Sequence, residues 1–427
     1  MFGRVGAVAV AATAALAVSL TAAGAIATTI TLPSTVSADP ANWTPTVRDS
    51  AAIPSSAVYA VEQSGATMFV GGHFDTVASA KATATIARKS LFSFDAASGA
   101  IRSLSDSFDG DVWALARSGS ALFVGGTFTK VDGVSRRGLV KVDAATGAVD
   151  SSFDARLGGN VTQVRLVNGR LVVSGSFPGK IKALSPVTGA DTGYITAAVT
   201  GTVASNAGPT EVYRFSVNPA GTRLVGIGNF TAVAGKHRMR AFMLDLGSAS
   251  ASVDPWYYQP LDNACRGVKL PDQLRDVDFA PSGQFFVIVA TGYIPATTAG
   301  IGRDICDAAV RFETNIANPS RPTWFNYSGG DTFHSVAVAG KDVYVQGHFR
   351  YLDNPQGHNS CGPGCVPRSG IGDVDATTGL ATSWNPGKDR GVGGKDLTVT
   401  TAGLWVGSDT VHLGGESHQD LGFFPEP

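Results

Sequence analysis

The stretch FVGGHF at residues 69–74 returns as FVGGTF at residues 123–128, and looser copies follow along the chain. The last residues of the seven copies are Phe74, Phe128, Phe177, Phe230, Tyr293, Phe349 and Thr410. Successive copies lie between 49 residues (Phe128 to Phe177) and 63 residues (Phe230 to Tyr293) apart. A hydrophobic run ending in Gly-x-Phe is typical of a short strand whose backbone passes close to a neighbour. A period near fifty residues therefore predicts an all-β fold, a seven-bladed β-propeller.

Each unit contains four short segments with strand character. In the first unit they are residues 57–65, 67–74, 90–99 and 100–108, which predicts four antiparallel strands per blade. The third segment ends in Asp-Ala-x-Ser/Thr-Gly in the units that match best. We interpret this motif as a tight turn in which Asp and Ser/Thr cap backbone N–H groups and Gly takes positive φ, in preference to a calcium or catalytic site.

These motifs carry a family resemblance. The order [FY]-V-x-G-x-F, a segment with Arg or Lys, Asp-Ala-x-[ST]-Gly and Trp-x-Pro resembles the delta-60-type repeat of bacterial secreted β-propellers, over residues 42 to 425. Units one, two and six match best, whereas unit three has Ser185-Pro186 in place of Asp-Ala. The resemblance implies the fold and secretion, and it implies no particular chemistry.

The ring of a propeller must be closed, and the sequence suggests how. The last unit lacks a convincing fourth strand, while Asn42-Trp43-Thr44-Pro45 resembles Trp384-Asn385-Pro386 at the end of unit six. We therefore expect residues 42–48 to join the last blade as its N-terminal closing strand, which would remove an exposed sheet edge. Residues 39–427 are then one β-propeller domain.

The N-terminus predicts export. Residues 5–38 contain no charged side chain, follow Arg4, and end in Val36-Ser37-Ala38, a small-residue pattern typical of signal-peptide cleavage. We expect residues 1–38 to be a secretory signal peptide and the protein to be extracellular or associated with the cell envelope. An uncleaved run of this length could instead anchor the chain in a membrane.

Composition limits the kind of partner. The chain has 33 basic and 34 acidic residues, so it lacks the basic surface that nucleic acids require. Charged residues make up 16% of the chain and glycines number 52, which favours strands and turns. We expect a monomer that binds no nucleic acid.

The four cysteines fit an oxidising compartment. Cys361 and Cys365 bracket Gly-Pro-Gly, a spacing that suits a small disulfide loop, and Cys265 would then pair with Cys306 by elimination. Three connectivities are open to four cysteines. A zinc site of four thiolates is the competing interpretation.

One slot near the start of each innermost strand collects large polar side chains. Alignment on Gly-x-Phe places there Tyr59, Trp113, Gln163, Tyr213, Arg275, His334 and Lys395. In a propeller these residues would ring one mouth of the central channel, where aromatic, amide and cationic groups could bind a sugar or a small anion. The alternative is that they only plug the channel.

Metal, cofactor and catalytic motifs are weak. His73 and His348 share one slot before the connection to the third strand. We interpret them as strand-end groups bonded to nearby backbone, and a metal site as the alternative. The sequence contains no Gly-x-Ser-x-Gly and no His-Glu-x-x-His, and we predict no cofactor and no metal.

Three functions fit this reading. The first is an exported, non-catalytic binding or scaffold propeller for a glycan, a cell-envelope component or a protein. The second is a secreted carbohydrate-active hydrolase or lyase that uses the channel-mouth face, and the third is a purely structural envelope protein. Carboxylates with shifted pKa values at the channel mouth would favour the enzyme.

Overall fold

The computed structural model describes residues 30–80, 82–203, 208–266 and 273–427. Strands dominate these ranges, and the helical elements in them are two short 3₁₀ helices, η1 (Gln259–Asp262) and η2 (Thr298–Gly300). The all-β prediction is confirmed. No helix within the described residues is long and apolar enough to cross a membrane. Residues 1–29, which hold most of the expected signal peptide, lie outside the described part.

Seven sheets in the described ranges share one plan, in which the first strand pairs antiparallel with the second and the second with the third. The first three strands of sheet one are β2 (Ala57–Ser64), β3 (Thr67–His73) and β6 (Leu91–Asp95), and those of sheet two are β7 (Val112–Ser118), β8 (Ala121–Gly126) and β11 (Leu139–Asp143). Those of sheet three are β12 (Val161–Val167), β13 (Arg170–Gly175) and β14 (Ile181–Leu184), and those of sheet four are β16 (Glu211–Val217), β17 (Arg223–Asn229) and β20 (Ala241–Leu246). The first three strands of sheet five are β22 (Leu274–Phe279), β23 (Phe285–Ala290) and β24 (Ala308–Glu313), and those of sheet six are β26 (Phe333–Val338), β27 (Asp342–Gly347) and β30 (Ile371–Asp375). Those of sheet seven are β31 (Asp396–Thr400), β32 (Gly403–Gly407) and β35 (Leu421–Pro425).

A fourth strand is complete in two of these sheets. It is β21 (Ala251–Val253) in sheet four and β25 (Trp324–Tyr327) in sheet five. In sheets one, two, three and six the expected fourth strand is reduced to one antiparallel bridge, at Ile101, Val149, Asp191 and Ala381.

Short strands in the remaining connections form small additional sheets on the rim. They are β1 (Thr46–Arg48), β4 (Thr76–Ala78), β5 (Ile86–Ala87), β9 (Lys130–Val131), β10 (Val134–Ser135), β15 (Val199–Thr200), β18 (Ala232–Val233), β19 (Lys236–His237), β28 (Tyr351–Leu352), β29 (Val366–Pro367), β33 (His412–Leu413) and β34 (Glu416–Ser417). Most of them occupy the connection between the second and third strands of a sheet.

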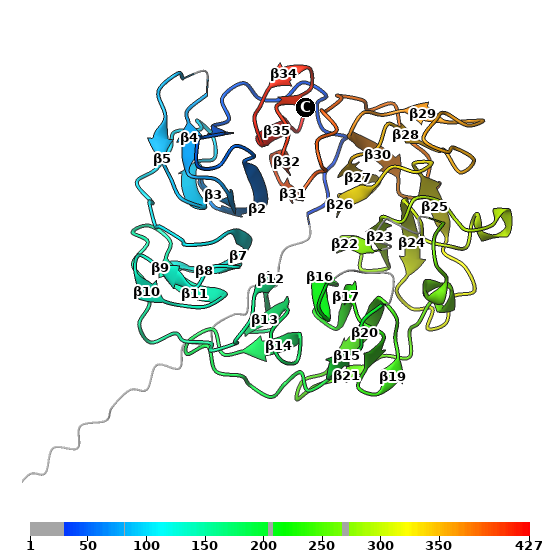
Figure 1. The fold of residues 1–427 in the computed structure, drawn as a ribbon, viewed down its shortest axis with the longest axis horizontal. Helices are drawn as coiled ribbons and strands as arrows, with labels where there is room; N and C mark the ends of the chain where they lie inside the picture. The colour runs from blue at the N-terminus through cyan, green and yellow to red at the C-terminus, as the bar shows by residue number, and fades with distance from the viewer. Residues whose placement is uncertain (1–29, 81, 204–207, 267–272) are drawn as a thin grey trace, which may run out of the picture.

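The seven sheets follow one another around a common centre, with their first strands nearest to it (Figure 1). Each first strand contacts the first strand of the next sheet, and β31 of the last sheet also contacts β2 of the first. The apolar cores lie between neighbouring sheets: Phe69 and Leu91 of sheet one pack with Leu122 of sheet two. The large apolar side chains are therefore buried between faces, and polar side chains are left for the centre.

The recurring glycines have a steric cause. The first strands of sheets one to six each contain a β-bulge near their start. The bulge brings the backbone of the first strand close to the second strand, so a Cβ on Gly72 would overlap the carbonyl oxygen of Ala57. A Cβ on Gly126 would likewise overlap the carbonyl oxygen of Asp111. Glycine at this position of Gly-x-Phe is thus required by the close backbone approach.

The Asp-Ala-x-Ser/Thr-Gly motif forms the predicted turn. The Asp143 Oδ1 accepts hydrogen bonds from the N–H and the hydroxyl of Thr146, both at 2.9 Å, and Gly147 has φ of +80°. In sheet three the hydroxyl of Ser185 takes the place of the carboxylate and accepts from the N–H of Thr188 at 3.3 Å. The turn therefore tolerates Ser in place of Asp.

Both predicted disulfides are present. Cys265 pairs with Cys306 and Cys361 pairs with Cys365, with Cα–Cα distances of 5.7 and 5.6 Å. All four thiols are consumed, so the four-thiolate zinc alternative is wrong. The pairs indicate folding in an oxidising environment.

The N-terminal segment lies along β35, earlier in the sequence than the expected residues 42–48. The N–H groups of Ser37 and Ala41 donate to the carbonyls of Pro425 and Phe423, both at 2.8 Å. Strand β1 (Thr46–Arg48) then pairs with β4 in the connection of sheet one. Within the expected segment, the N–H of Val47 donates to the carbonyl of Gln419, just before β35, at 3.2 Å. The Trp43 ring also packs on the last sheet, 5.8 Å from the ring of Trp405.

Candidate functional site

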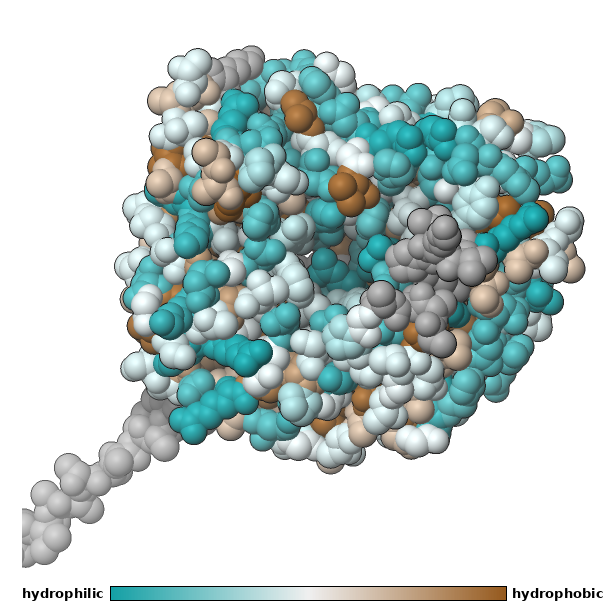
Figure 2. Space-filling model, in the orientation of Figure 1, coloured by the Kyte–Doolittle hydropathy of each residue, from teal (hydrophilic) through white to brown (hydrophobic). Residues whose placement is uncertain are grey.

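The bulged residues of the first strands coincide with most of the predicted channel-mouth slot. The register shifts leave Tyr59, Trp113, Tyr213, Arg275 and His334 without a partner in the neighbouring strand. We refer to these five as the mouth residues; all are half-buried. A bulge turns a side chain away from the regular alternation of the sheet. The space-filling view shows a hollow at the centre of the molecule with mainly hydrophilic residues around it (Figure 2).

Gln163 lies elsewhere. The bulged residue of sheet three is Thr162, whose hydroxyl donates to the carbonyl of Val212 at 2.8 Å. The Gln163 Oε1 accepts from the N–H of Phe215 in the next sheet at 2.6 Å and is buried. Gln163 therefore joins two sheets through its side-chain carbonyl oxygen.

Lys395 reaches the mouth without a bulge. Its Nζ lies 5.8 Å from the centre of the Tyr59 ring and 3.4 Å from the Asp409 carboxylate. Burial raises the pKa of the Tyr59 hydroxyl to about 12, and the charges of Asp111 and Asp409 add to the shift. Sheets seven and one thus place a cation beside an aromatic face.

Arg275 is a mouth residue with unused hydrogen-bonding capacity. Its Nε is buried and has no acceptor, and its terminal nitrogens make no hydrogen bond to any residue in the described part of the chain. Burial lowers the pKa of the guanidinium, while nearby Tyr213 and Asp307 oppose that shift. Burial raises the pKa of Tyr213 to about 12. A charged fork with free donors can bind a carboxylate or a similar anion.

His334 is the mouth residue on the first strand of sheet six. Burial lowers the pKa of its imidazole well below the ordinary range, and the positive charges of Arg275, Lys395 and Lys388 lower it further. The ring is neutral at neutral pH and can donate and accept one hydrogen bond. A Cβ on Gly393 would overlap the His334 ring, so the backbone of Gly393 packs directly on this histidine.

Lys388 was not predicted from the sequence. It is 4% exposed, and burial lowers the pKa of its ammonium to about 8, although Asp409 and Asp389 favour the charged form. The residue belongs to the stretch GKDRGVGGKD at 387–396. Nothing in a glycine-rich, charged stretch of this kind indicates that one of its lysines is buried.

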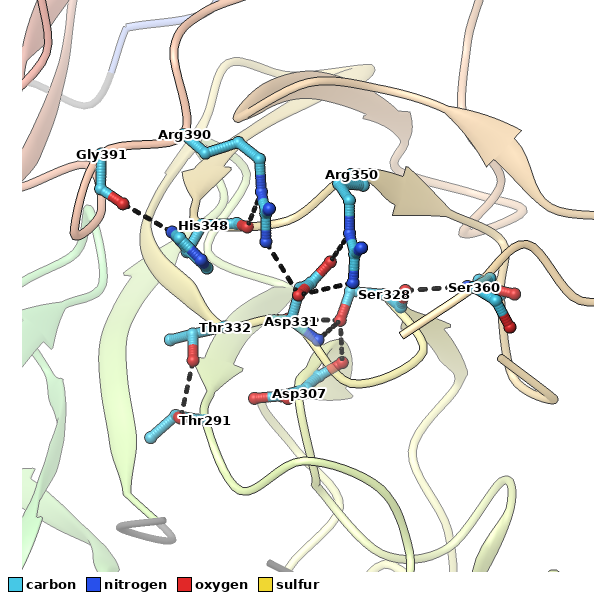
Figure 3. Close-up of polar contacts among 11 residues, drawn as sticks. Thr291, Asp307, Ser328, Asp331, Thr332, His348, Arg350, Ser360, Arg390 and Gly391 are labelled. Carbon is cyan, nitrogen blue, oxygen red and sulfur yellow. Dashed lines mark hydrogen bonds and ion pairs between the residues drawn. The ribbon is translucent and has the colours of Figure 1, made fainter. Parts of the chain in front are cut away.

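A second unpredicted feature is the Asp331 cluster, formed by Asp331, Arg350, Arg390 and His348 (Figure 3). Arg350 binds the Asp331 carboxylate through Nε at 2.8 Å and Nη2 at 3.2 Å. The Nη2 of Arg390 reaches the same carboxylate at 3.0 Å, and its Nε donates to the carbonyl of His348 at 2.7 Å. The cluster ties the start of the sixth sheet to the connection before the seventh.

Asp307 lies beside this cluster. Its side chain is buried, and its Oδ1 has no hydrogen-bond partner within the described ranges. Burial raises the pKa of the carboxyl well above its ordinary value, and the charge of Asp331 raises it further. The hydroxyl of Ser328 contacts the carbonyls of both residues (Figure 3). Two carboxyls with different environments thus stand near the mouth.

Farther from the mouth, carboxylates on the first strands accept hydrogen bonds from the adjacent sheet. Asp276 and Asp278 accept from the N–H groups of Val336 and Val338 at 3.0 and 2.9 Å. Asp396 accepts from the N–H of Val61 at 2.8 Å, across the junction of sheets seven and one. These acceptors satisfy inner-edge N–H groups that no further strand covers.

The two aligned histidines have ordinary partners. His348 Nδ1 lies 2.5 Å from the carbonyl oxygen of Gly391, and His73 Nδ1 lies 2.6 Å from the Asp111 carboxylate. They belong to different sheets, one and six, and no group of three or more metal-ligating side chains occurs among the described residues.

A separate concavity of about 660 Å³ lies on the rim, away from the mouth. Its lining includes Trp324, Phe325, Arg321 and Pro363, beside the Cys361–Cys365 loop. The Trp324 ring is 6% exposed, and its Nε1 donates to the carbonyl of Ala376. The ring is therefore part of the core, while the lining of the concavity also includes polar residues such as Thr323 and Asp353.

Neither a family model nor a curated protein sequence matches the chain. The chain aligns with several solved structures. The structure of U3-55K aligns with a TM-score of 0.50 and 9% identity over 91% of this chain and 100% of that chain. The designed Ika8 protein aligns with 0.46 and 12% over 89% and 98%, and Kuenenia stuttgartiensis hydrazine synthase with 0.41 and 13% over 71% and 78%. The similarity to U3-55K concerns the fold alone.

Proposed function

We propose that the protein is an exported, non-catalytic seven-bladed β-propeller of the delta-60-repeat type that binds an acidic glycan at its channel mouth. The observation that supports this function is the Arg275 guanidinium, half-buried in the mouth with no hydrogen-bond acceptor in the described chain. A desolvated arginine held without a partner is ready to bind a carboxylate with two parallel hydrogen bonds.

The other mouth residues suit a sugar that carries a carboxylate. Tyr59 and Trp113 are half-buried aromatic side chains that can stack on the apolar face of a sugar ring. Lys395 adds a second cation beside Tyr59, and neutral His334 can hydrogen-bond a hydroxyl. An acidic polysaccharide of the cell envelope would combine these chemical groups.

Substitution of Arg275 tests the proposal. We expect Arg275→Gln to weaken binding of uronate-containing oligosaccharides at least about 10-fold, because a charge-assisted hydrogen bond contributes roughly 1.5 to 3 kcal/mol. Titration calorimetry with acidic and matched neutral oligosaccharides measures the change. Arg117→Gln is the control, since Arg117 lies at the far end of a first strand and donates to the carbonyl of Gly119. Equal loss in both variants, or equal binding of neutral sugars, would contradict an anion site at Arg275.

A hydrolase or lyase is the second candidate, and the Asp307 and Asp331 pair supports it. Two neighbouring carboxyls, one of which has a pKa raised well above its ordinary value, are typical of acid and base pairs. Against this function, Asp331 is bonded by two arginines and both side chains are buried, so substrate access is poor. Incubation of the protein and its Asp307→Asn variant with a panel of polysaccharides decides the matter. Turnover by the parent that is lost in the variant would establish the enzyme.

A further inference from the structure

Residues 30–38, inside the expected signal peptide, are packed into the fold. Leu32 is 2% exposed and Val36 is 3% exposed. They share one apolar cluster with Tyr344, Trp384 and Phe424, which come from sheets six and seven. The segment therefore fills the space between these sheets with side chains that leave water completely.

Hydrogen bonds hold the same segment at several points. The N–H of Val36 donates to the Tyr344 hydroxyl at 3.1 Å, and the Trp384 Nε1 donates to the carbonyl of Ser37 at 3.1 Å. The N–H of Ser34 donates to the Glu426 carboxylate at 3.0 Å. Together with the Ser37 bond to Pro425, these contacts reach both neighbouring sheets.

Cleavage after Ala38 would remove this entire segment. It would uncover the apolar faces of Tyr344 and Trp384 and leave the Trp384 indole N–H without its acceptor. Loss of two buried aliphatic side chains and several hydrogen bonds is a large cost for a folded domain. A cleavage site placed there conflicts with the packing.

We propose that residues 30–38, which we call the closing strap, stay in the exported protein and that the leader is cleaved on the N-terminal side of Ile30. The sequence offers Ala25-Ile26-Ala27, small residues at the spacing that a leader peptidase recognises. Water would hydrolyse the bond between Ala27 and Thr28, giving a carboxylate on Ala27 and an amine on Thr28. The proposed cleavage position depends on the proposed export, whereas the packing of the closing strap does not.

The first experiment locates the cleavage. The complete chain is expressed with its own leader in an exporting bacterium, and the N-terminal peptide of the exported protein is identified by mass spectrometry. We expect it to begin before Ile30. Ala38→Asp should leave processing unchanged, because a charged residue before the cut blocks only a cleavage after residue 38. An exported, folded protein that begins at Asp39 would overturn the proposal.

The second experiment tests the strap without export. Chains of residues 28–427 and 39–427 are prepared with defined N-termini under oxidising conditions and compared by thermal melting. We expect the shorter chain to melt about 5 °C or more below the longer one. Within residues 28–427, Val36→Asp should reproduce this loss, while Ala38→Asp, at an exposed position, should not. Equal melting temperatures of the two chains would refute the stabilising role of the closing strap, even if export is confirmed. A failure of export alone would refute only the proposed cleavage position.

Discussion

Gly126 and its counterparts stand where the first and second strands come closest. A single methyl group at this position would overlap a carbonyl oxygen of the first strand. That oxygen belongs to the backbone next to a bulge, and the bulge positions the mouth residue. The same glycine thus permits both the pairing of the strands and the direction of the side chain that faces the centre.

Gly126→Ala should therefore destabilise the fold by about 1 to 3 kcal/mol, as other overpacked sites do. Urea unfolding followed by tryptophan fluorescence measures the change. The control is Gly119→Asn, at a turn with φ of +59° and no atom within 4 Å of an added Cβ, since Asn tolerates that conformation. Equal stability of Gly126→Ala and its parent would mean that the two strands separate easily at this point.

At the scale of elements, the first strands have inner edges whose N–H groups need acceptors. Their inner edges face the centre, where no further strand can pair with them. Asp276, Asp278 and Asp396 supply acceptors from the neighbouring first strand in place of that partner. Burial raises the pKa of Asp276 to about 6 and that of Asp278 to about 7, because few water molecules reach these carboxyls.

Asp276→Ala should cost about 1 to 3 kcal/mol, because the N–H of Val336 would lose its acceptor. Asp276→Asn keeps an oxygen at the same place and should cost much less. Denaturant melts of the two variants give the comparison. An Asn variant as unstable as the Ala variant would show that the charge, and not the acceptor, is what the site requires.

The sequence predicted the order of the strands, and its alignment placed in one slot five residues that the structure shows at β-bulges, because Gly-x-Phe marks the same point in each unit. The prediction at Gln163 missed the bulge by one residue, since Val-Thr-Gln-Val offers two polar residues and no aromatic ring to mark the position. The Asp331 cluster could not be predicted. Asp331, Arg350 and Arg390 belong to three connections of unequal length, and their meeting depends on how those connections fold.

At the scale of the whole molecule, buried acids make stability depend on pH. Asp420 is 2% exposed and Asp106 is 4% exposed. Burial raises the pKa of Asp420 to about 8 and that of Asp106 to about 7. Between the ordinary pKa of an aspartate and these values, the folded chain binds more protons than the unfolded chain, so stability falls as pH rises.

We expect the melting temperature to be higher at pH 5 than at pH 8, by roughly 5 °C or more. Differential scanning calorimetry across this range provides the test. Asp420→Asn should flatten the dependence, because it removes a buried carboxyl whose pKa is raised to about 8 while keeping an oxygen near Ser56. A melting temperature that rises from pH 5 to pH 8 would mean that these carboxyls are hydrated in the folded protein.

The junction between the last and first sheets also limits the order of folding. Ser56 and Asp420, which share a hydrogen bond, are separated by 364 positions in the sequence. Contacts this distant form late and slowly, because a long loop must close before they contribute. A chain emerging from its N-terminus keeps one face of the first sheet uncovered until the final strand β35 appears. The molecule therefore completes its fold only after nearly all of the chain is free.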